Sequence, residues 1–351
     1  MKKNVFLITG NMGYVGTTLT KYLRFQYPDA SIIGYDTAFF ASSIIGDVKF
    51  PERNLDMQYF GDLRDFPIDI LNNVDTVIHL AAISNDPMGN EFEDITNQIN
   101  HIESIKLAER SKHAGVKNFV FASSCSVYGF ASEMPKTELD EVNPLTAYAK
   151  SKIDTEKNLE KIAGNNFVVT CLRFATACGF NNRIRLDLVL NDFVASAISL
   201  NKISILSDGT PHRPLIDVKD MARAIDWASF RSNDKRGDFL VINVGSDSAN
   251  YTIKELAEYV TIFQNSNSTF EVNPQAAPDK RSYKVNFNLF KTLAPNHQPK
   301  MTINDSIKGL FEGLIDAGFN DIKFRESNLI RLNILRTMKS KNIINKDLNY
   351  N

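Results

Sequence analysis

A glycine-rich segment directly after the first apolar run constrains this chain more than any other feature. Val5–Thr9 is a continuous apolar run, and the letters TGNMGYVG follow at residues 9–16. Gly10 permits a tight turn, Gly13 lets the backbone approach a pyrophosphate, and Gly16 allows close packing of the next helix, whose N-terminus would face the phosphate charge. Because the spacing is G-x-x-G-x-x-G rather than the commoner G-x-G-x-x-G, its position after a strand carries the weight. The segment predicts a dinucleotide-binding strand–turn–helix.

Short apolar runs alternate with helical stretches through the first half of the chain. Strands are predicted at Val5–Thr9, Ser31–Asp36, Gln58–Phe60, Asp75–Leu80, Asn118–Ala122 and Phe167–Leu172. Helices are predicted at Val15–Tyr27, at roughly Phe92–His113 and at about Ala147–Ile162. Uniformly apolar strands suit burial on both faces, and right-handed βαβ connections give a doubly wound parallel sheet. The predicted fold class is α/β: a Rossmann doubly wound parallel sheet with a smaller interleaved C-terminal substrate domain.

The rhythm changes after about residue 175, where elements shorten and loops carry Pro, Asn and Asp, as at Asn273–Pro278. We expect a Rossmann domain over 1–175, with a later return at about 215–245. A second domain is expected over 176–322, followed by a C-terminal tail over 323–351. Apolar residues spaced among basic ones from Lys323 onward predict a terminal helix packed on the body rather than a membrane anchor.

The composition of the chain limits which binding partners and which cellular compartment we expect. The net charge of −1 does not favour a polyanion such as nucleic acid. The three cysteines, Cys125, Cys171 and Cys178, lack C-x-x-C spacing, so neither a disulfide framework nor a metal site is predicted. The apolar run after Lys2 and Lys3 is too short for a signal peptide, and no run of about 18 apolar residues suggests a membrane span. We expect a cytoplasmic protein.

Polar residues at predicted strand ends suggest which dinucleotide binds. Asp36 ends the second strand, where a carboxylate would bind the adenosine ribose hydroxyls and repel a 2′-phosphate, which favours NAD over NADP; the alternative is a turn aspartate. Asp62 is expected either to contact the adenine amino group or to lie in a surface turn. Small residues in HLAA, at 79–82, would let the cofactor lie against the sheet edge, whereas His79 itself is expected to be a core histidine.

Tyr148 and Lys152 have Y-x-x-x-K spacing and would share one face of a helix. A free tyrosine has a pKa near 10, and we expect a neighbouring ammonium and the nicotinamide charge to lower it toward working pH. Ser124, just past the fifth strand, would hydrogen-bond the reacting oxygen while Tyr148 takes the proton. Ser123 and Ser126 compete for that role on composition alone.

At this point the chain resembles the extended short-chain dehydrogenase/reductases, specifically the NAD-dependent epimerase/dehydratase family that acts on nucleotide sugars. The resemblance runs from residue 4 to about 320 and rests on TGNMGYVG, Asp36, GDLRD, HLAA, Asn100 in N-x-x-E-S, SSCSVYG, Tyr148 to Lys152, RFATACG and RPLIDVKD. It implies Ser124, Tyr148 and Lys152 as catalytic residues and Asn100 as a structural one. The implied NAD contacts are Gly10, Asn11, Met12, Gly13, Tyr14, Val15, Gly16, Asp36, Asp62, Leu63, Leu80, Ala81, Ala82, Tyr148 and Lys152.

The resemblance also implies a nucleotide-sugar site in the later half. Arg213 and Arg281 match arginines that meet the nucleotide diphosphate, with surface salt bridges as the alternative. Arg183 and Arg185 are further candidates, and Thr176 and Cys178 depart from common family residues. The expected substrate contacts are Ser84, Ser124, Cys125, Thr176, Asn191, Arg213 and Arg281.

The expected activity is epimerisation of a nucleotide-diphosphate sugar, at C4 through a transient 4-keto sugar. A dehydrogenase or ketosugar reductase would use the same residues and stays open. A 4,6-dehydratase is less favoured because Cys125 and Ser126 stand where those relatives have Asp-Glu. A non-enzymatic dinucleotide-binding protein is disfavoured by the intact Ser, Tyr and Lys set. The family further implies a homodimer through the helices near 92–113 and 147–162.

Overall fold

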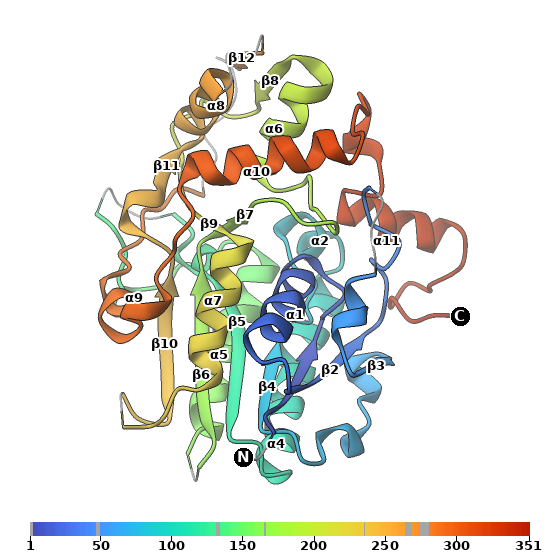
Figure 1. The fold of residues 1–351 in the computed structure, drawn as a ribbon, viewed down its shortest axis with the longest axis vertical. Helices are drawn as coiled ribbons and strands as arrows, with labels where there is room; N and C mark the ends of the chain where they lie inside the picture. Colours follow the sequence, from blue (N-terminus) through green and yellow to red (C-terminus); the bar gives the residue numbers. More distant parts are fainter. Residues whose placement is uncertain are drawn as a thin grey trace.

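A parallel sheet forms the centre of the protein (Figure 1). The computed structural model describes residues 3–46, 50–130, 134–164, 166–234, 236–263, 268–273 and 281–351. The seven strands lie in the order β10-β6-β5-β4-β1-β2-β3, and each neighbouring pair is parallel. They are β1 (Val5–Thr9), β2 (Ser31–Asp36), β3 (Met57–Phe60), β4 (Thr76–His79), β5 (Asn118–Ser124), β6 (Val168–Phe174) and β10 (Phe239–Val244). The predicted Rossmann fold class is confirmed.

Helices cover both faces of this sheet, which explains its apolar strands. Successive side chains of β1 point to opposite faces: Phe6 and Ile8 join the core beneath helices α1 and α7, and Leu7 joins the core on the other side, with α4 and α5. The helices on the two faces of the sheet are α1 (Tyr14–Gln26), α2 (Asp86–Glu91), α3 (Glu93–Asn97), α4 (Ser104–His113), α5 (Ala147–Ile162) and α7 (Val218–Ser229). The order of connection reverses between β1 and β4, where a crevice opens at the carboxyl ends.

A smaller lobe sits over those carboxyl ends, at the top of Figure 1. It has a three-stranded sheet in the order β11-β9-β7 and a pair formed by β12 and β8. A third apolar core lies among its helices. Its elements are β7 (Thr176–Cys178), α6 (Val189–Leu200), β8 (Lys202–Ile205), β9 (His212–Asp217), β11 (Asn250–Thr252), α8 (Ile253–Ile262), β12 (Thr269–Val272) and α10 (Ile303–Asp316). Helix α9 (Asn288–Leu293) packs instead against β10, at the edge of the central sheet. Of the loop predicted at Asn273–Pro278, all but Asn273 lies outside the described residues.

The helix predicted over Phe92–His113 is interrupted. Helices α3 and α4 are separated by a π-helical segment, Gln98–Glu103, and the short helix α2 precedes them. Within the π segment, buried Asn100 accepts a hydrogen bond from the Ile83 amide at 2.8 Å and donates to the Ile83 carbonyl at 3.0 Å. The wider turn therefore places a side-chain amide where it holds the loop after β4, an effect that apolar periodicity does not reveal.

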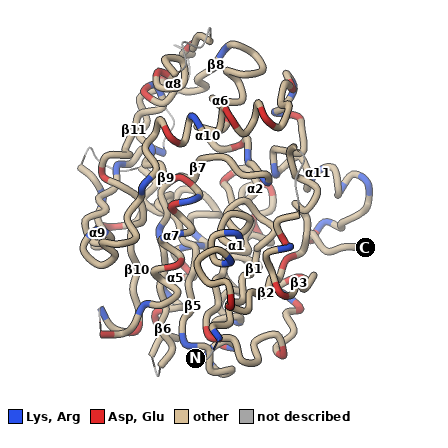
Figure 2. Tube along the Cα trace, viewed as in Figure 1, with Lys and Arg blue, Asp and Glu red and all other residues tan. Residues whose placement is uncertain are grey.

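The chain ends beside the Rossmann sheet rather than on the smaller lobe. Helix α11 (Arg331–Ser340) follows α10, and Figure 1 shows the C-terminus near β2 and β3. Leu335, Ile344 and Leu348 are buried in the core on one face of the sheet. The expected terminal helix is therefore present and packed on the body. Among the described residues, no helix is long and apolar enough to span a bilayer. Figure 2 shows acidic and basic residues interspersed along the chain.

Candidate active site

A cavity of about 870 Å³ lies between the carboxyl ends of the sheet and the smaller lobe. Its lining begins at the glycine-rich turn, passes Tyr148 and Lys152, and reaches Arg213 and Arg281. This volume is in the range of cofactor and ligand sites, and the location is where doubly wound sheets bind their ligands. Most of the residues predicted from the sequence to bind cofactor or substrate line this one cavity.

The glycine-rich turn is shaped by contacts that exclude a side chain. Gly10 has a φ of +75°, and a Cβ there would lie 2.6 Å from the Ala81 amide nitrogen. A Cβ at Gly16 would lie 2.5 Å from the Asn11 backbone. Gly13 precedes α1 without a capping side chain, and the first turn of α1 contains no acidic residue. The N-terminus of α1 is therefore suited to an anion from outside the chain, which fits the pyrophosphate of a dinucleotide.

Asp36 lies at the end of β2 and lines the cavity. Its carboxylate accepts hydrogen bonds from the amides of Met12, at 2.9 Å, and Ala38, at 2.8 Å. Burial raises its pKa, and these two hydrogen bonds oppose the rise. A carboxylate held this way can accept hydrogen bonds from ribose hydroxyls and would repel a 2′-phosphate, so the described residues fit NAD.

Other predicted cofactor residues divide into two groups. Gly13, Tyr14, Val15, Leu63, Leu80, Ala81 and Ala82 line the cavity. The side chains of Asn11 and Met12 do not: Asn11 donates to Gln58 at 2.6 Å, and Met12 contributes its amide to Asp36. Asp62 borders the cavity, but its carboxylate forms an ion pair with Arg64 at 2.8 Å. The cofactor contacts predicted for Asn11 and Met12 stay predictions, and they would involve the backbone of the glycine-rich turn rather than these side chains.

Ser124, Tyr148 and Lys152 meet in the middle of the cavity. Ser124 ends β5, and the other two lie one turn apart on α5. The Ser124 hydroxyl accepts a hydrogen bond from the Ser126 amide at 3.1 Å and lies close enough to Tyr148 to lower its pKa. The Lys152 Nζ lies 5.5 Å from the centroid of the Tyr148 ring. The strand end and the helix thus bring a hydroxyl, a phenol and an ammonium group to one point.

Burial shifts the pKa values of Tyr148 and Lys152 in opposite directions. Burial and the nearby charge of Asp86 raise the pKa of Tyr148 to about 12, although Arg185 and the Ser124 hydroxyl oppose the rise. Burial lowers the pKa of Lys152 to about 7, opposed by the charge of Glu156. In the chain alone the pKa of Tyr148 is therefore raised, and the lowering that we expect from the ammonium and the nicotinamide charge together stays a prediction. Burial favours the neutral phenol, so the phenol keeps its proton until further positive charge arrives.

The three residues next to Ser124, which are Ser123, Cys125 and Ser126, differ in whether they face the core or the cavity. Ser123 hydrogen-bonds buried Glu156, and the Cys125 thiol donates to the Arg173 carbonyl at 3.1 Å. Cys125 lies in the core beneath the sheet, so its predicted substrate contact is not supported. Ser126 lines the cavity, and its hydroxyl is buried without a hydrogen-bond partner among the described residues. Ser126 is therefore a candidate for contact with a ligand.

The far end of the cavity contains the two predicted phosphate-binding arginines. Arg281 donates to Asp86 at 2.7 Å. Arg213 donates to the His212 carbonyl at 2.9 Å and lies over the Tyr283 ring, 5.4 Å from its centroid. Thr176 also lines this region. Both guanidinium groups border the cavity beyond Ser124, Tyr148 and Lys152.

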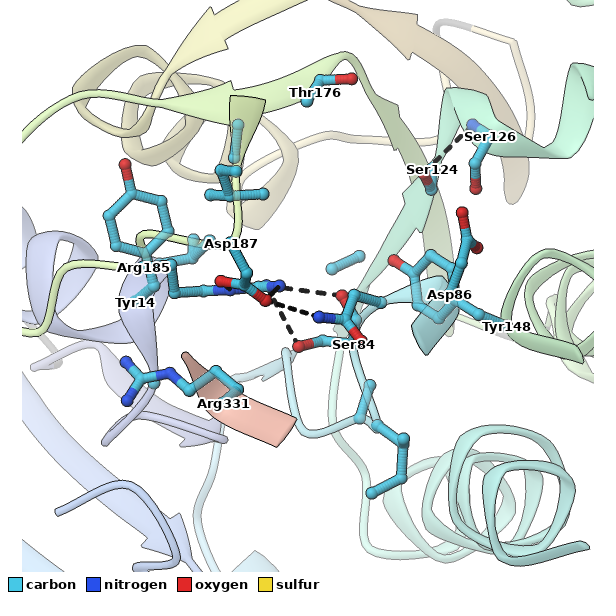
Figure 3. Close-up of a pocket in the computed structure, with 18 of the residues that line it drawn as sticks. Tyr14, Ser84, Asp86, Ser124, Ser126, Tyr148, Thr176, Arg185, Asp187 and Arg331 are labelled. Carbon is cyan, nitrogen blue, oxygen red and sulfur yellow. Dashed lines mark hydrogen bonds and ion pairs between the residues drawn. The ribbon is translucent and has the colours of Figure 1, made fainter. Parts of the chain in front are cut away.

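An ion pair that sequence reasoning missed forms the wall near the middle (Figure 3). Arg185 donates to Asp187 at 3.0 and 2.8 Å and to the Ser84 hydroxyl at 3.2 Å. Asn191 is buried behind this wall and donates to the Arg185 carbonyl at 2.9 Å, so its predicted substrate contact is not supported. Arg183 is fully buried in an ion pair with Glu52.

Asp86 was also missed, although it lies near Tyr148 in Figure 3. Ser84 belongs to the loop after β4, and Asp86 is the first residue of α2, which follows that loop at a strand carboxyl end. That position was the available signal, because this edge of the sheet forms the site. His79, which ends β4, is neutral, as expected of a core histidine: burial lowers its pKa to about 3, and it hydrogen-bonds Thr9 and Ser104.

Comparison with known proteins agrees with this geometry. The chain is 26% identical to a UDP-glucose 4-epimerase of Halalkalibacterium halodurans, over 79% of this chain and 85% of the relative. It is 25% identical to UDP-glucuronic acid decarboxylase 2 of Arabidopsis thaliana, over 90% of this chain and 69% of the relative. A solved UDP-glucose-4-epimerase from Stenotrophomonas maltophila, with bound NAD and formylated UDP-arabinopyranose, has the same fold, with a TM-score of 0.77 and 21% identity over 90% of this chain and 99% of that one.

The family itself follows from a match over most of the Rossmann domain and part of the smaller lobe. The model of the NAD dependent epimerase/dehydratase family matches residues 6–245. That range includes the glycine-rich turn, Asp36, Ser124, Tyr148 and Lys152. The chain therefore belongs to the NAD-dependent epimerase/dehydratase family and is an NAD-dependent enzyme.

Proposed function

We propose that the chain epimerises a nucleotide-diphosphate sugar at C4 through a transient 4-keto sugar. The observation that carries the proposal is the position of Ser124, Tyr148 and Lys152 in one cavity. That cavity has the dinucleotide turn at one end and Arg213 and Arg281 at the other. A sugar bound through its diphosphate to the arginines would present a hydroxyl to Tyr148. The similarity to UDP-glucose 4-epimerases supports this reading.

NAD, which the glycine-rich turn and Asp36 would hold, would supply reversible hydride transfer at the sugar carbon. Tyr148 takes the proton of the sugar hydroxyl, and Ser124 donates a hydrogen bond to the same oxygen. Lys152 stabilises the phenolate and would hold the nicotinamide ribose. After the keto sugar turns over in the cavity, Tyr148 gives the proton back. The two half-reactions balance, with no net oxidation.

The raised pKa of Tyr148 makes its ionisation depend on the bound cofactor. A phenol with a pKa of about 12 is protonated at neutral pH. The positive charge of oxidised nicotinamide would favour the phenolate. We therefore expect the base to form only when oxidised NAD is present.

The diphosphate end favours a nucleotide-diphosphate substrate over a free sugar. Arg213 and Arg281 can each present two donors to phosphate oxygens, and Ser84, Ser124 and Thr176 offer hydroxyls along the way. The Ser126 hydroxyl joins this set.

We further propose a cytoplasmic homodimer that packs through α4 and α5. Light scattering on the purified protein tests the oligomeric state.

The test is to incubate the purified protein, with no added cofactor, with UDP-, GDP-, CDP- and dTDP-sugars, UDP-glucuronic acid included, and to identify the sugars by proton NMR. Catalytic formation of a C4 epimer is the expected result. Stoichiometric ketosugar, or turnover that requires added NAD or NADH, would replace the proposal with a dehydrogenase or reductase. Release of carbon dioxide or loss of water would replace it with a decarboxylase or dehydratase.

A further inference from the structure

A buried arginine of the C-terminal helix borders the dinucleotide end of the cavity. Arg331 begins α11 and lines the cavity, although only 1% of it is exposed. Its Nη2 donates to the Arg183 carbonyl at 2.9 Å, and its guanidinium carbon lies 4.7 Å from the centroid of the Phe40 ring. Figure 3 shows it on the same side of the cavity as Tyr14, the first residue of α1.

The carboxylates near Arg331 are already engaged. Glu52 pairs with Arg183, and Asp187 pairs with Arg185. Asp36 accepts its two backbone hydrogen bonds. Among the residues that the structure describes, Arg331 forms no ion pair, and its buried Nη1 has no hydrogen-bond partner.

This arrangement is costly for the chain alone. A buried guanidinium loses its hydration, and one carbonyl and one ring face do not replace an ion pair or satisfy Nη1. Burial, together with the positive charge of Arg185, lowers the pKa of Arg331 to about 9. An anion in the cavity would compensate the positive charge of Arg331, and the uncapped N-terminus of α1 favours an anion at the same end.

We propose that Arg331 is a cofactor-binding residue whose free Nη1 donates to the pyrophosphate of NAD. The C-terminal helix would thereby complete a site that is otherwise built by β1, α1 and β2. The adenosine end fits this source of phosphate better than the substrate does, because the Arg331 guanidinium lies over the ring of Phe40, which lines the cavity four residues after Asp36. The substrate diphosphate has its own arginines, Arg213 and Arg281.

The last residues of the chain hold α11 in this position. The Tyr350 hydroxyl donates to the Thr37 carbonyl at 3.0 Å, and its ring lies 5.3 Å from that of Phe39. Arg64 donates to the Asp347 carbonyl at 2.7 Å. Thr37 and Phe39 line the cavity next to Asp36, so the tail packs around the adenosine end.

The test is calorimetric titration of nucleotide-free protein with ADP-ribose, adenosine and UDP, comparing wild type with Arg331→Met. We expect the Kd for ADP-ribose to rise about 10- to 100-fold, as for loss of a charged hydrogen bond, with no change for adenosine or UDP. Arg336→Met is the matched control, because Arg336 lies on the same helix but is exposed and paired with Glu91. Its three affinities should equal those of wild type.

Unchanged affinity for ADP-ribose in Arg331→Met would overturn the proposal. So would equal losses for ADP-ribose and adenosine, which indicate a collapsed site, or a loss for UDP alone, which assigns Arg331 to the substrate. Thermal unfolding of the nucleotide-free proteins provides a second readout. A phosphate-binding role predicts that Arg331→Met melts no lower than wild type, because an unpaired buried charge is removed. If Arg331→Met does not fold, Arg331→Lys keeps the charge and should lose part of the ADP-ribose affinity, and equal affinity would overturn the proposal.

Discussion

The Nζ of Lys152 lies 5.5 Å from the centroid of the Tyr148 ring, one helical turn along α5. The helix places the two groups together, and the buried position shifts their pKa values in opposite directions, to about 7 for Lys152 and about 12 for Tyr148. Both shifts favour the neutral form, as burial does. Oxidised NAD, which brings positive charge beside the phenol, is what we expect to favour its ionisation.

Replacing Tyr148 with Phe should lower turnover about 100- to 10,000-fold, because the proton acceptor is lost. The phenyl ring keeps most of the packing, so bound NAD should remain. Turnover is measured by NMR and NAD content by its absorbance after release from denatured protein. Near wild-type turnover would remove Tyr148 from its role as base.

The low pKa of Lys152 predicts a pH dependence of stability. An unfolded lysine has a pKa near 10.4, so between about pH 7 and pH 10 the unfolded chain binds more protons at this residue than the folded one. The free energy of unfolding of nucleotide-free wild type, relative to Lys152→Met, should therefore rise with pH in this window, by up to about 1.4 kcal/mol per pH unit. Denaturant titrations at pH 7, 8 and 9 measure it. A flat difference between the two proteins would show that the lysine stays charged.

Asp36 should determine the choice between NAD and NADP. Substituting Asn keeps the hydrogen-bond acceptor for Met12 or Ala38 but removes the charge that repels a 2′-phosphate. We expect the ratio of the Kd for NADP to the Kd for NAD to fall by about tenfold or more, since electrostatic and hydrogen-bond losses of this kind amount to about 1.5–3 kcal/mol. Titration with both nucleotides measures the ratio, and an unchanged ratio would assign Asp36 to the turn alone.

Gly10→Ala should lower the free energy of unfolding by about 2 kcal/mol or more and abolish tight NAD binding. The position has a φ of +75°, and the new Cβ would lie 2.6 Å from the Ala81 amide nitrogen. Gly309→Ala is the control, because nothing lies within 4 Å of a Cβ there and the residue is inside α10. It should instead raise stability by about 0.5–1 kcal/mol. Denaturant unfolding of both variants separates a strained turn from a general effect of added side chains.

Local sequence determined the parts of the site that lie on one element or on adjacent ones. The glycine-rich turn, Asp36, and the Tyr148–Lys152 pair follow from strand ends and helical spacing, which depend on a few neighbouring residues. The predicted bounds Val5–Thr9, Ser31–Asp36 and Ala147–Ile162 agree with the structure. These elements are strongly patterned, so periodicity alone defines them.

Tertiary structure decided which side chains face the cavity and what charge they meet there. Cys125 and Ser126 are adjacent in the chain, yet one is in the core and the other lines the cavity, because the short turn after β5 points them in different directions. Asp86 raises the pKa of Tyr148 from the start of α2, 62 positions earlier in the chain. Arg331 reaches the dinucleotide end from the last helix. Burial and long-range charge depend on packing between distant segments, and the spacing of residues in the sequence carries no record of that packing.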